Sequence, residues 1–296
     1  MKIGAHMSVA GGMANAVERA RLHGCEALQI FAKNASQWKG KPLDPAGVAT
    51  FRRRIDETGI APVVSHASYL INLATTVPAL REQSTVAFID ELDRAETLGL
   101  RGVVIHPGTC TAGTEAGALR LIAESIRTAL AARPEQRTMV LLEHTAGQGR
   151  TVGHCFEHLA AILEHLDGSP RVGVCLDTCH LLASGYDIST PAGYDETFTR
   201  FDRLVGLNRL EVFHANDSKK PCGSHVDRHE HIGDGYVGRE AFRRLLHDPR
   251  FANLPLLIET AEGARERTRG SDRRGSVRRE EPWDPAGASL VSALRS

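Results

Sequence analysis

The sequence lacks a net charge, because 36 acidic residues balance 36 lysines and arginines. No overall positive field therefore indicates a nucleic-acid partner, although a local basic face or bound cations would attract DNA equally well. Only six of the basic residues are lysine, a bias that we attribute to GC-rich coding. The charge balance by itself therefore excludes neither DNA nor a small molecule as the partner.

The chain also lacks the patterns of membrane proteins, secreted proteins and zinc fingers. Nowhere do eighteen apolar residues follow one another, and the first residues, MKIGAHMSVAGG, contain no apolar signal-peptide core. The six cysteines form no CxxC pair and no finger-like spacing, which is typical of reduced thiols in the cytosol. We therefore expect a soluble, cytoplasmic protein without a membrane partner.

Short apolar strands alternate with helical patterns over most of the 296 residues. Such an alternation predicts a parallel sheet with right-handed crossovers. An open doubly wound sheet would be shorter and would carry a GxGxxG turn after its first strand, which this sequence does not have. Eight units over this length match a single-domain TIM barrel, (β/α)8. We expect strands at 2–6, 27–31, 61–65, 102–105, 138–142, 172–176, 209–213 and 255–258, and helices at 13–23, 44–58, 80–98, 115–132, 154–166, 195–205 and 239–246.

The alternation ends after Glu259. Residues 261–283 are charged, rich in arginine and interrupted by glycine, and they contain too few apolar residues to form a core. Only residues 284–295 have the pattern of a final helix. We therefore divide the chain into a barrel domain, residues 1–260, and an irregular Arg/Gly-rich tail, residues 261–296, whose removal from residue 265 onward we expect to leave the metal content intact.

The last six expected strands all run into a histidine or a carboxylate. A single histidine after an apolar run is more often a packing residue than a ligand, but six consecutive strands ending in this way are improbable as core packing. Catalytic groups of a barrel lie where its strands end. We therefore expect one shared site formed by His66, His106, Glu143, Asp177, His214 and Glu259.

Two short motifs add further candidate ligands. Asp177-Thr-Cys-His180 places an imidazole three residues after a carboxylate as a strand gives way to a helix. Asp227-Arg-His229 alternates like an extended segment, with both side chains on one side. Imidazole and carboxylate together suit zinc or manganese better than calcium or magnesium. The nine candidates are enough for more than one ion, and two neighbouring ions can clamp an in-line displacement at phosphorus.

Longer motifs surround these candidates. They are HMSVAGG (6–12), KNASQW (33–38), HASYLINLA (66–74), HPG (106–108), TAGQG (145–149), VGVCLDTCHLLASGYD (172–187), FHANDSK (213–219) and VDRHEHIGDGYVG (226–238). From residue 1 to about residue 260 the chain thus resembles the endonuclease IV family of apurinic/apyrimidinic (AP) endonucleases. The resemblance implies a zinc-dependent phosphodiester hydrolase of base excision repair. Such an enzyme cuts duplex DNA 5′ to an abasic site and leaves 3′-hydroxyl and 5′-deoxyribose phosphate ends.

The resemblance also implies where the cofactor and the substrate bind. It assigns three zinc ions, with manganese possible in part, to His66, His106 and Glu143, to Glu143, Asp177, His214 and Glu259, and to His180, Asp227 and His229. The catalytic carboxylates would be Glu259, which orients the attacking water, and Glu143, which fixes the metal spacing. The residues that enter the minor groove would be Gln37, Tyr69 and Leu70. The family further suggests a monomer.

The chain departs from the family pattern at Ser36, where an arginine is usual. A smaller side chain cannot wedge into the base stack in the same way, so we expect weaker binding of damaged DNA unless another arginine takes over. Ala215 replaces a larger apolar residue, and the segment TAEGARERTRG after Glu259 replaces a proline-containing turn. Because of the second difference, the resemblance to the family predicts nothing about the structure of the tail.

Two other functions stay open at the level of sequence. A sugar isomerase or epimerase of the xylose isomerase type would share the barrel and its strand-end ligands. It would not need the group of His180, Asp227 and His229, nor the loops of Gln37 and Tyr69. A non-catalytic binder of damaged DNA would use zinc structurally. One or two metals with sugar turnover would identify the isomerase, and binding without cleavage would identify the binder.

Overall fold

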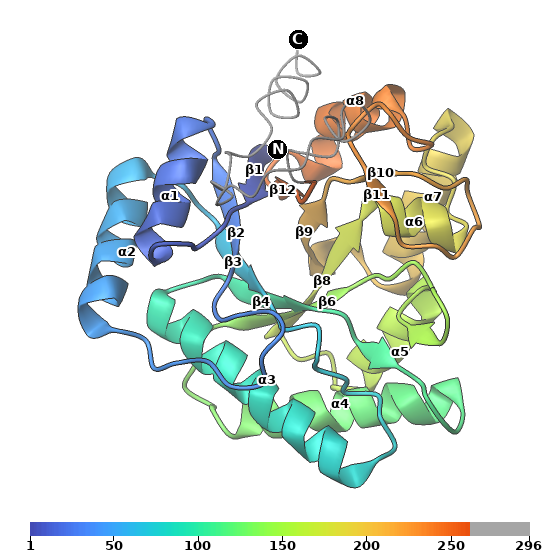
Figure 1. The fold of residues 1–296 in the computed structure, drawn as a ribbon. Helices are drawn as coiled ribbons and strands as arrows, with labels where there is room; N and C mark the ends of the chain where they lie inside the picture. Colours follow the sequence, from blue (N-terminus) through green and yellow to red (C-terminus); the bar gives the residue numbers. More distant parts are fainter. Residues whose placement is uncertain (261–296) are drawn as a thin grey trace, which may run out of the picture.

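Eight parallel strands close into a barrel in the computed structural model, which describes residues 1–260 (Figure 1). The expected tail at 261–296 and its helix at 284–295 lie outside the described residues. The barrel strands, in their order around the ring, are β1 (Lys2–His6), β2 (Ala27–Phe31), β3 (Val63–His66), β4 (Gly102–Ile105), β6 (Met139–Glu143), β8 (Val172–Asp177), β9 (Leu210–His214) and β12 (Pro255–Ile258). β12 pairs in parallel with β1 and so closes the ring. The predicted (β/α)8 barrel is confirmed.

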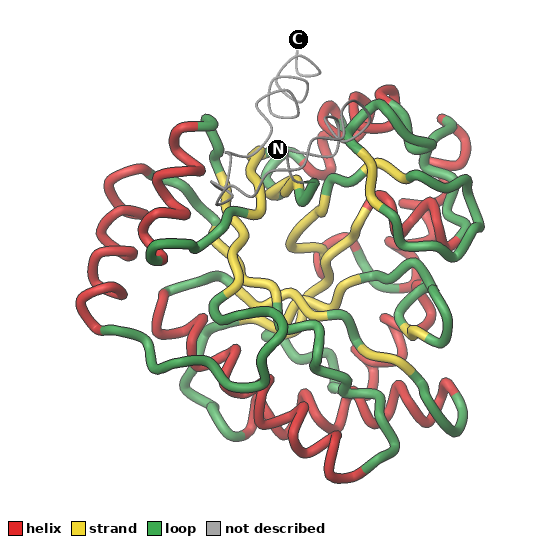
Figure 2. Tube along the Cα trace, viewed as in Figure 1, coloured by secondary structure: helices red, strands yellow, loops and turns green. Residues whose placement is uncertain are grey.

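Helices surround the barrel, as Figure 2 shows by the red elements outside the yellow strands. Within residues 1–260 the α-helices are α1 (Met13–Leu22), α2 (Pro45–Thr58), α3 (Pro78–Leu98), α4 (Glu115–Ala131), α5 (Phe156–His165), α6 (Thr178–Ser184), α7 (Pro191–Leu204) and α8 (Arg239–His247). The sequence pattern predicted one helix, at 195–205, between β8 and β9. The structure has two, α6 and α7. Gly185, with φ at 107°, ends α6 in the left-handed region that glycine tolerates.

Capping side chains explain where several helices begin. Asp44 accepts a hydrogen bond from the backbone N–H of Gly47 at the start of α2, with a distance of 2.9 Å. Thr114 and Thr190 cap α4 and α7 in the same manner. Each cap satisfies one of the backbone donors that the first helical turn leaves free. α2, α3 and α7 also begin with proline, whose missing N–H costs nothing at this position.

The barrel interior below the candidate site is apolar. It is filled by inward-facing side chains of alternate strand positions, namely Ala27, Val64, Val104, Met139, Leu141, Cys175, Val212 and Leu257. Gly4 on β1 leaves room for this packing, because a Cβ there would lie 2.0 Å from the carbonyl oxygen of Ala27. A larger core between strands and helices surrounds this layer. The packed interior supports the strand ends rigidly.

The loops after the strands carry structure that the sequence pattern did not reveal. β5 (Gly108–Thr109) pairs with β7 (Thr151–Val152), and β10 (Asp217–Ser218) pairs with β11 (His229–Glu230), both antiparallel. Two short 3-10 helices, Leu207–Arg209 and Pro249–Phe251, complete the described elements. The β10–β11 pair folds a long loop back toward the barrel, so that His229 returns to the strand ends. Within residues 1–260, no helix is long and apolar enough to span a bilayer.

Candidate metal centre

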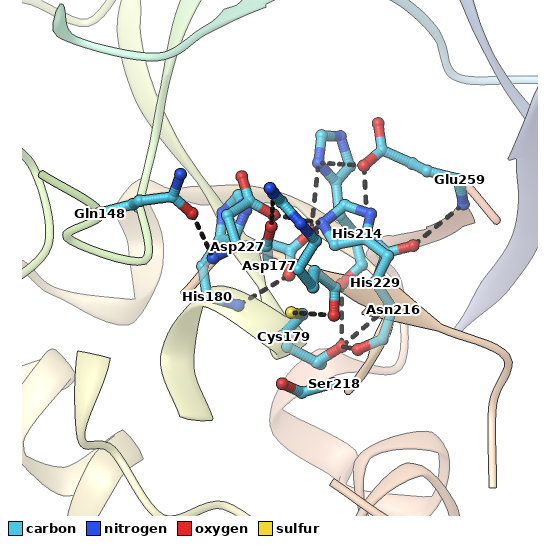
Figure 3. Close-up of polar contacts among 12 residues, drawn as sticks. Gln148, Asp177, Cys179, His180, His214, Asn216, Ser218, Asp227, His229 and Glu259 are labelled. Atoms are coloured by element: carbon cyan, nitrogen blue, oxygen red, sulfur yellow. Dashed lines mark hydrogen bonds and ion pairs between the residues drawn. The ribbon is translucent and has the colours of Figure 1, made fainter. Parts of the chain in front are cut away.

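The nine residues that the sequence singled out as ligands meet at one end of the barrel. Four of them are the final residues of their strands, and two follow a strand directly. The strands include their polar last residues because the backbone is still paired there, for example Asp177 with His214. The other three come from α6 and from the loop that ends in β11. Figure 3 shows how six of the nine point toward one another: Asp177, His180, His214, Asp227, His229 and Glu259.

The first group consists of His66, His106 and Glu143. The Nε2 atoms of both imidazoles lie 3.1 Å from Oε2 of Glu143. His66 donates its Nδ1–H to the carbonyl oxygen of Ala67 at 2.8 Å, which leaves a lone pair on Nε2. Ligand histidines in metalloproteins are held by such a bond on their second nitrogen.

The second group consists of His180, Asp227 and His229. Asp227 lies between the imidazoles, with Oδ2 at 3.2 Å from Nε2 of His180 and Oδ1 at 3.2 Å from Nε2 of His229. His180 donates its Nδ1–H to the carbonyl oxygen of His144 at 2.8 Å, so its Nε2 also carries a lone pair. Nε2 of His180 and Nε2 of His229 are buried and make no hydrogen bond with good geometry.

The third group is formed by Asp177, His214 and Glu259 beside Glu143. Nδ1 of His214 lies 3.1 Å from Glu143, 3.4 Å from Glu259 and 4.0 Å from Asp177. His214 donates its Nε2–H to Oε1 of Gln29 at 2.9 Å. Its Nδ1 lone pair is therefore directed at the carboxylates.

These contacts fit a site for cations. A lone pair on nitrogen that faces a carboxylate oxygen at about 3 Å is stable only when a proton or a metal ion lies between the two atoms. The same orientation recurs at His66, His180 and His214. Three separate imidazoles thus present metal-binding lone pairs to carboxylates in one cluster.

The electrostatics of the cluster also call for positive charge. Burial alone would lower the pKa of His180, but the carboxylates of Asp177, Asp227 and Glu143 raise that pKa to about 10. Burial alone would raise the pKa of Glu259, but the neighbouring imidazoles, His214 first, hold it at about 2. The pKa of Glu143 is likewise held well below its usual range by imidazoles in spite of burial. Divalent cations would take the place of the protons that this field attracts.

The sequence pattern missed residues that hold the ligands in place. Asn216 donates from Nδ2 to Asp177 at 2.6 Å and to Glu259 at 3.1 Å (Figure 3). Gln29 donates from Nε2 to Glu259 at 2.6 Å and to Nδ1 of His6 at 3.0 Å. Both amides are fully buried. Gln29 was detectable as the one polar residue of the apolar strand ALQIF, and Asn216 as part of FHANDSK.

The three residues expected to enter DNA lie in the loops after β2 and β3. Tyr69 and Leu70 are unusually exposed for apolar or aromatic side chains, at 65% and 37%. The Tyr69 ring packs against Phe31, with 5.6 Å between ring centroids, and against the His66 ring at 5.3 Å. Gln37 is exposed in the preceding loop. Tyr69 therefore lies directly beside the ligand cluster.

Comparisons with known proteins agree with the motifs. The family described as "Xylose isomerase-like TIM barrel" matches residues 17–280. A probable endonuclease 4 of Chloroflexus aurantiacus is 51% identical over 263 residues, which cover 88% of this chain and 92% of the relative. The crystal structure of endonuclease IV from Thermus thermophilus superposes with a TM-score of 0.80 at 39% identity, over 90% of this chain and 94% of that one.

Sugar-epimerising barrels share the architecture only. The crystal structure of a D-psicose 3-epimerase superposes with a TM-score of 0.64 at 17% identity, over 88% of this chain and 86% of that one. At so low an identity the likeness shows the fold alone. The identity of 51% to an endonuclease 4 sequence, carried over 88% of this chain, shows more: the chain belongs to the endonuclease IV family.

Proposed function

We propose that this DNA-repair endonuclease of the endonuclease IV family cuts duplex DNA 5′ to abasic sites by means of three zinc ions. Hydrolysis at that bond leaves 3′-hydroxyl and 5′-deoxyribose phosphate ends, as base excision repair requires. The observation that carries the proposal is the convergence of five imidazoles and four carboxylates at the strand ends of one barrel. A barrel of this family concentrates its chemistry at that face.

The three ligand groups would hold one zinc ion each. His66 and His106 would share Glu143 with the group of Asp177, His214 and Glu259, while His180, Asp227 and His229 would hold the third ion. When bound, zinc lowers the pKa of water and offsets the negative charge of the phosphate and of the leaving oxygen. Mixed imidazole and carboxylate donors also accept manganese, so part of the sites can hold that ion.

Glu143 would set the spacing of the centre. Its Oε2 contacts His66 and His106, and its Oε1 lies 3.1 Å from His214 and 3.4 Å from His180. The Glu143 side chain is 1% exposed, so its position is defined by these contacts. Glu143 therefore acts by holding ligands from three groups at fixed separations.

Glu259 would orient the attacking water. Its side chain is 16% exposed, in contrast to the fully buried side chain of Asp177. Gln29 holds one of its oxygens and Asn216 the other, so the orientation of the carboxylate is fixed. The remaining acceptor lone pairs are free to direct a water molecule toward phosphorus.

The exposed loops would recognise the lesion. An abasic site leaves a gap in the base stack, and enzymes that extrude a nucleotide fill such a gap with apolar or aromatic side chains. Tyr69 and Leu70 are exposed beside the ligand cluster, and Gln37 is exposed in the neighbouring loop. We assign minor-groove contacts to these three side chains.

The chain would act as a monomer in the cytoplasm, on the chromosome. All nine candidate ligands come from one chain, so the centre needs no residue from a second subunit. The substrate determines the place of action, so the enzyme would act where the chromosomal DNA lies.

Cleavage of a duplex with one tetrahydrofuran abasic analogue tests the proposal, because the analogue cannot undergo β-elimination. We expect one cut that leaves a 3′-hydroxyl, no cut in the intact duplex, and loss of cutting in Glu259→Gln. Glu240→Gln, which changes an exposed glutamate of α8, is the matched control and should cut normally. Slow loss of activity in EDTA would indicate firmly held zinc. Binding without a cut would contradict catalysis, and the absence of both would contradict the DNA substrate.

A further inference from the structure

We propose that Ser68 and the buried ion pair of Lys33 and Glu91 are positioning residues for lesion recognition, an inference that rests on the proposed function. They join two loops that are separate in sequence. One loop, residues 32–41, carries Gln37, and the other, residues 67–74, carries Tyr69 and Leu70. The joined loops would present their side chains to DNA at a fixed separation.

Lys33 holds its own loop against α3. Its side chain is 1% exposed, and Nζ donates to the carbonyl oxygens of Trp38 at 3.1 Å and Ala87 at 3.2 Å. It also lies 3.0 Å from Asp90 and 3.4 Å from Glu91, both on α3. The bond to Trp38 closes residues 33–38 on themselves, with Gln37 inside the closed segment. The loop of Gln37 is thus tied at its base to a long helix.

Glu91 and Ser68 connect the second loop to the same anchor. Oε1 of Glu91, the oxygen that faces Lys33, accepts the backbone N–H of Ser68 at 3.0 Å. The Ser68 hydroxyl donates to the carbonyl oxygen of Ala35 at 2.7 Å. Ser68 directly precedes Tyr69, and Ala35 lies two residues before Gln37. Two hydrogen bonds from one serine therefore fix one loop to the other and to α3.

The charges of the anchor are balanced. Arg94 of α3, whose side chain is 8% exposed, donates to Asp90 at 3.0 Å and to the carbonyl oxygen of Lys41 at 2.6 Å. Two cations thus neutralise Asp90 and Glu91. Buried ionic groups of this kind add little net stability compared with apolar packing. Their geometric precision at the base of two loops points to positioning as their role.

Fixed loops would lower the cost of binding DNA. Side chains and loops that become ordered only in a complex reduce affinity, whereas loops ordered beforehand do not. Tyr69, Leu70 and Gln37 would bind DNA more tightly in loops held at a fixed separation, because the gap at an abasic site has a fixed size that their side chains must match. Loss of the Ser68 hydroxyl should therefore raise KM for abasic DNA while the metal centre stays intact.

Ser68→Ala, compared with Ser125→Ala, tests the inference. Ser125 is a matched control, because its hydroxyl is equally buried and donates to the carbonyl oxygen of Leu121 in α4, away from the loops. We expect Ser68→Ala to raise KM for the tetrahydrofuran duplex about fivefold, as the loss of one hydrogen bond implies. Its kcat, its zinc content and its hydrolysis of bis(p-nitrophenyl) phosphate should equal those of the wild type. Ser125→Ala should change none of these.

Two further variants make the outcome decisive. Glu91→Gln keeps an acceptor for Ser68 but weakens the tie to Lys33, and it should raise KM in the same manner. In a Tyr69→Ala background, Ser68→Ala should raise KM by a smaller factor than in the wild type, because one of the side chains that Ser68 positions is gone. An unchanged KM, full additivity, or equal losses on DNA and on the small diester would each overturn the inference. A wild-type enzyme that does not cut abasic DNA would refute the proposed function first, which distinguishes the two failures.

Discussion

Gln29 and Glu259 are joined by a hydrogen bond of 2.6 Å from the side-chain amide to the carboxylate. β2, which contains Gln29, and β12, which Glu259 directly follows, lie on either side of β1, although the two residues are 230 positions apart in the chain. The carbonyl oxygen of the same amide accepts the Nε2–H of His214 at 2.9 Å. One side chain thus orients two candidate metal ligands.

Gln29→Ala should weaken zinc binding by about 10- to 100-fold, the usual cost of losing a residue that orients metal ligands. Competition with a chromogenic chelator measures the affinity. Gln136→Ala is the control, because Gln136 donates to Asp93 at 2.7 Å outside the site. Equal zinc affinity in both variants would show that Gln29 is only a packing residue.

Asp227→Asn should release about one zinc ion per chain, because a neutral amide is a poor ligand beside two imidazoles. Metal analysis after gel filtration gives the stoichiometry, and Asp195→Asn on α7 serves as the control. Retention of the full zinc content would remove Asp227 from the ligand set.

Ser36→Arg should tighten binding of abasic duplex on the order of fivefold, because a guanidinium can stack at the edge of the lesion. Fluorescence anisotropy with abasic and intact duplexes measures the change. Ser36→Lys has the same charge without the planar group and should improve both duplexes alike. An equal gain for arginine and lysine would mean that charge alone is responsible.

Glu96 should make stability depend on pH in the acidic range. Burial by itself would raise the pKa of this carboxyl, but hydrogen bonds from the hydroxyl and N–H of Thr138 and the N–H of Arg137 hold the pKa below its usual value. The stabilisation is therefore complete above the unfolded pKa of about 4.3 and is lost as the pH falls below it.

Melting temperatures of wild type and Glu96→Gln, measured from pH 7 down to about pH 3, test this dependence. The wild type should melt at the higher temperature near neutral pH, and the difference should shrink in acid. If the difference in melting temperature stays constant through the acidic range, the substitution acts by changing the packing of the side chain and not its charge.

Deletion of residues 265–296 should leave zinc content and the melting transition close to those of the full chain. All eight barrel strands and all nine candidate ligands lie within residues 1–260. Metal analysis and circular dichroism of the shortened chain measure both quantities. A loss of metal would show that the metal centre needs the tail, although the barrel itself is closed by residues 1–260.

Much of the fold and of the candidate site could be predicted from the chain alone. Apolar runs of four to six residues that end in His66, Glu143, Asp177 or His214 identified the strands and their polar ends together. The parallel alternation then placed those ends at one face of a barrel. This inference works because the apolar pattern of each strand, and the alternation of strands with helices, are visible in short stretches of the sequence.

The tertiary structure decided which side chains hold the ligands and tie the loops. Gln29 could be seen as polar within an apolar strand, but its bonds to Glu259 and His214 depend on the closure of β1 between β2 and β12. In the sequence, Ser68 and Lys33 have the pattern of ordinary loop residues. In the structure, Glu91 of α3 contacts both of them. Hydrogen bonds between segments far apart in the chain depend on packing, and no local pattern encodes them. The sequence by itself therefore determined the barrel and its candidate ligands, and only the closed barrel decided how those ligands are oriented.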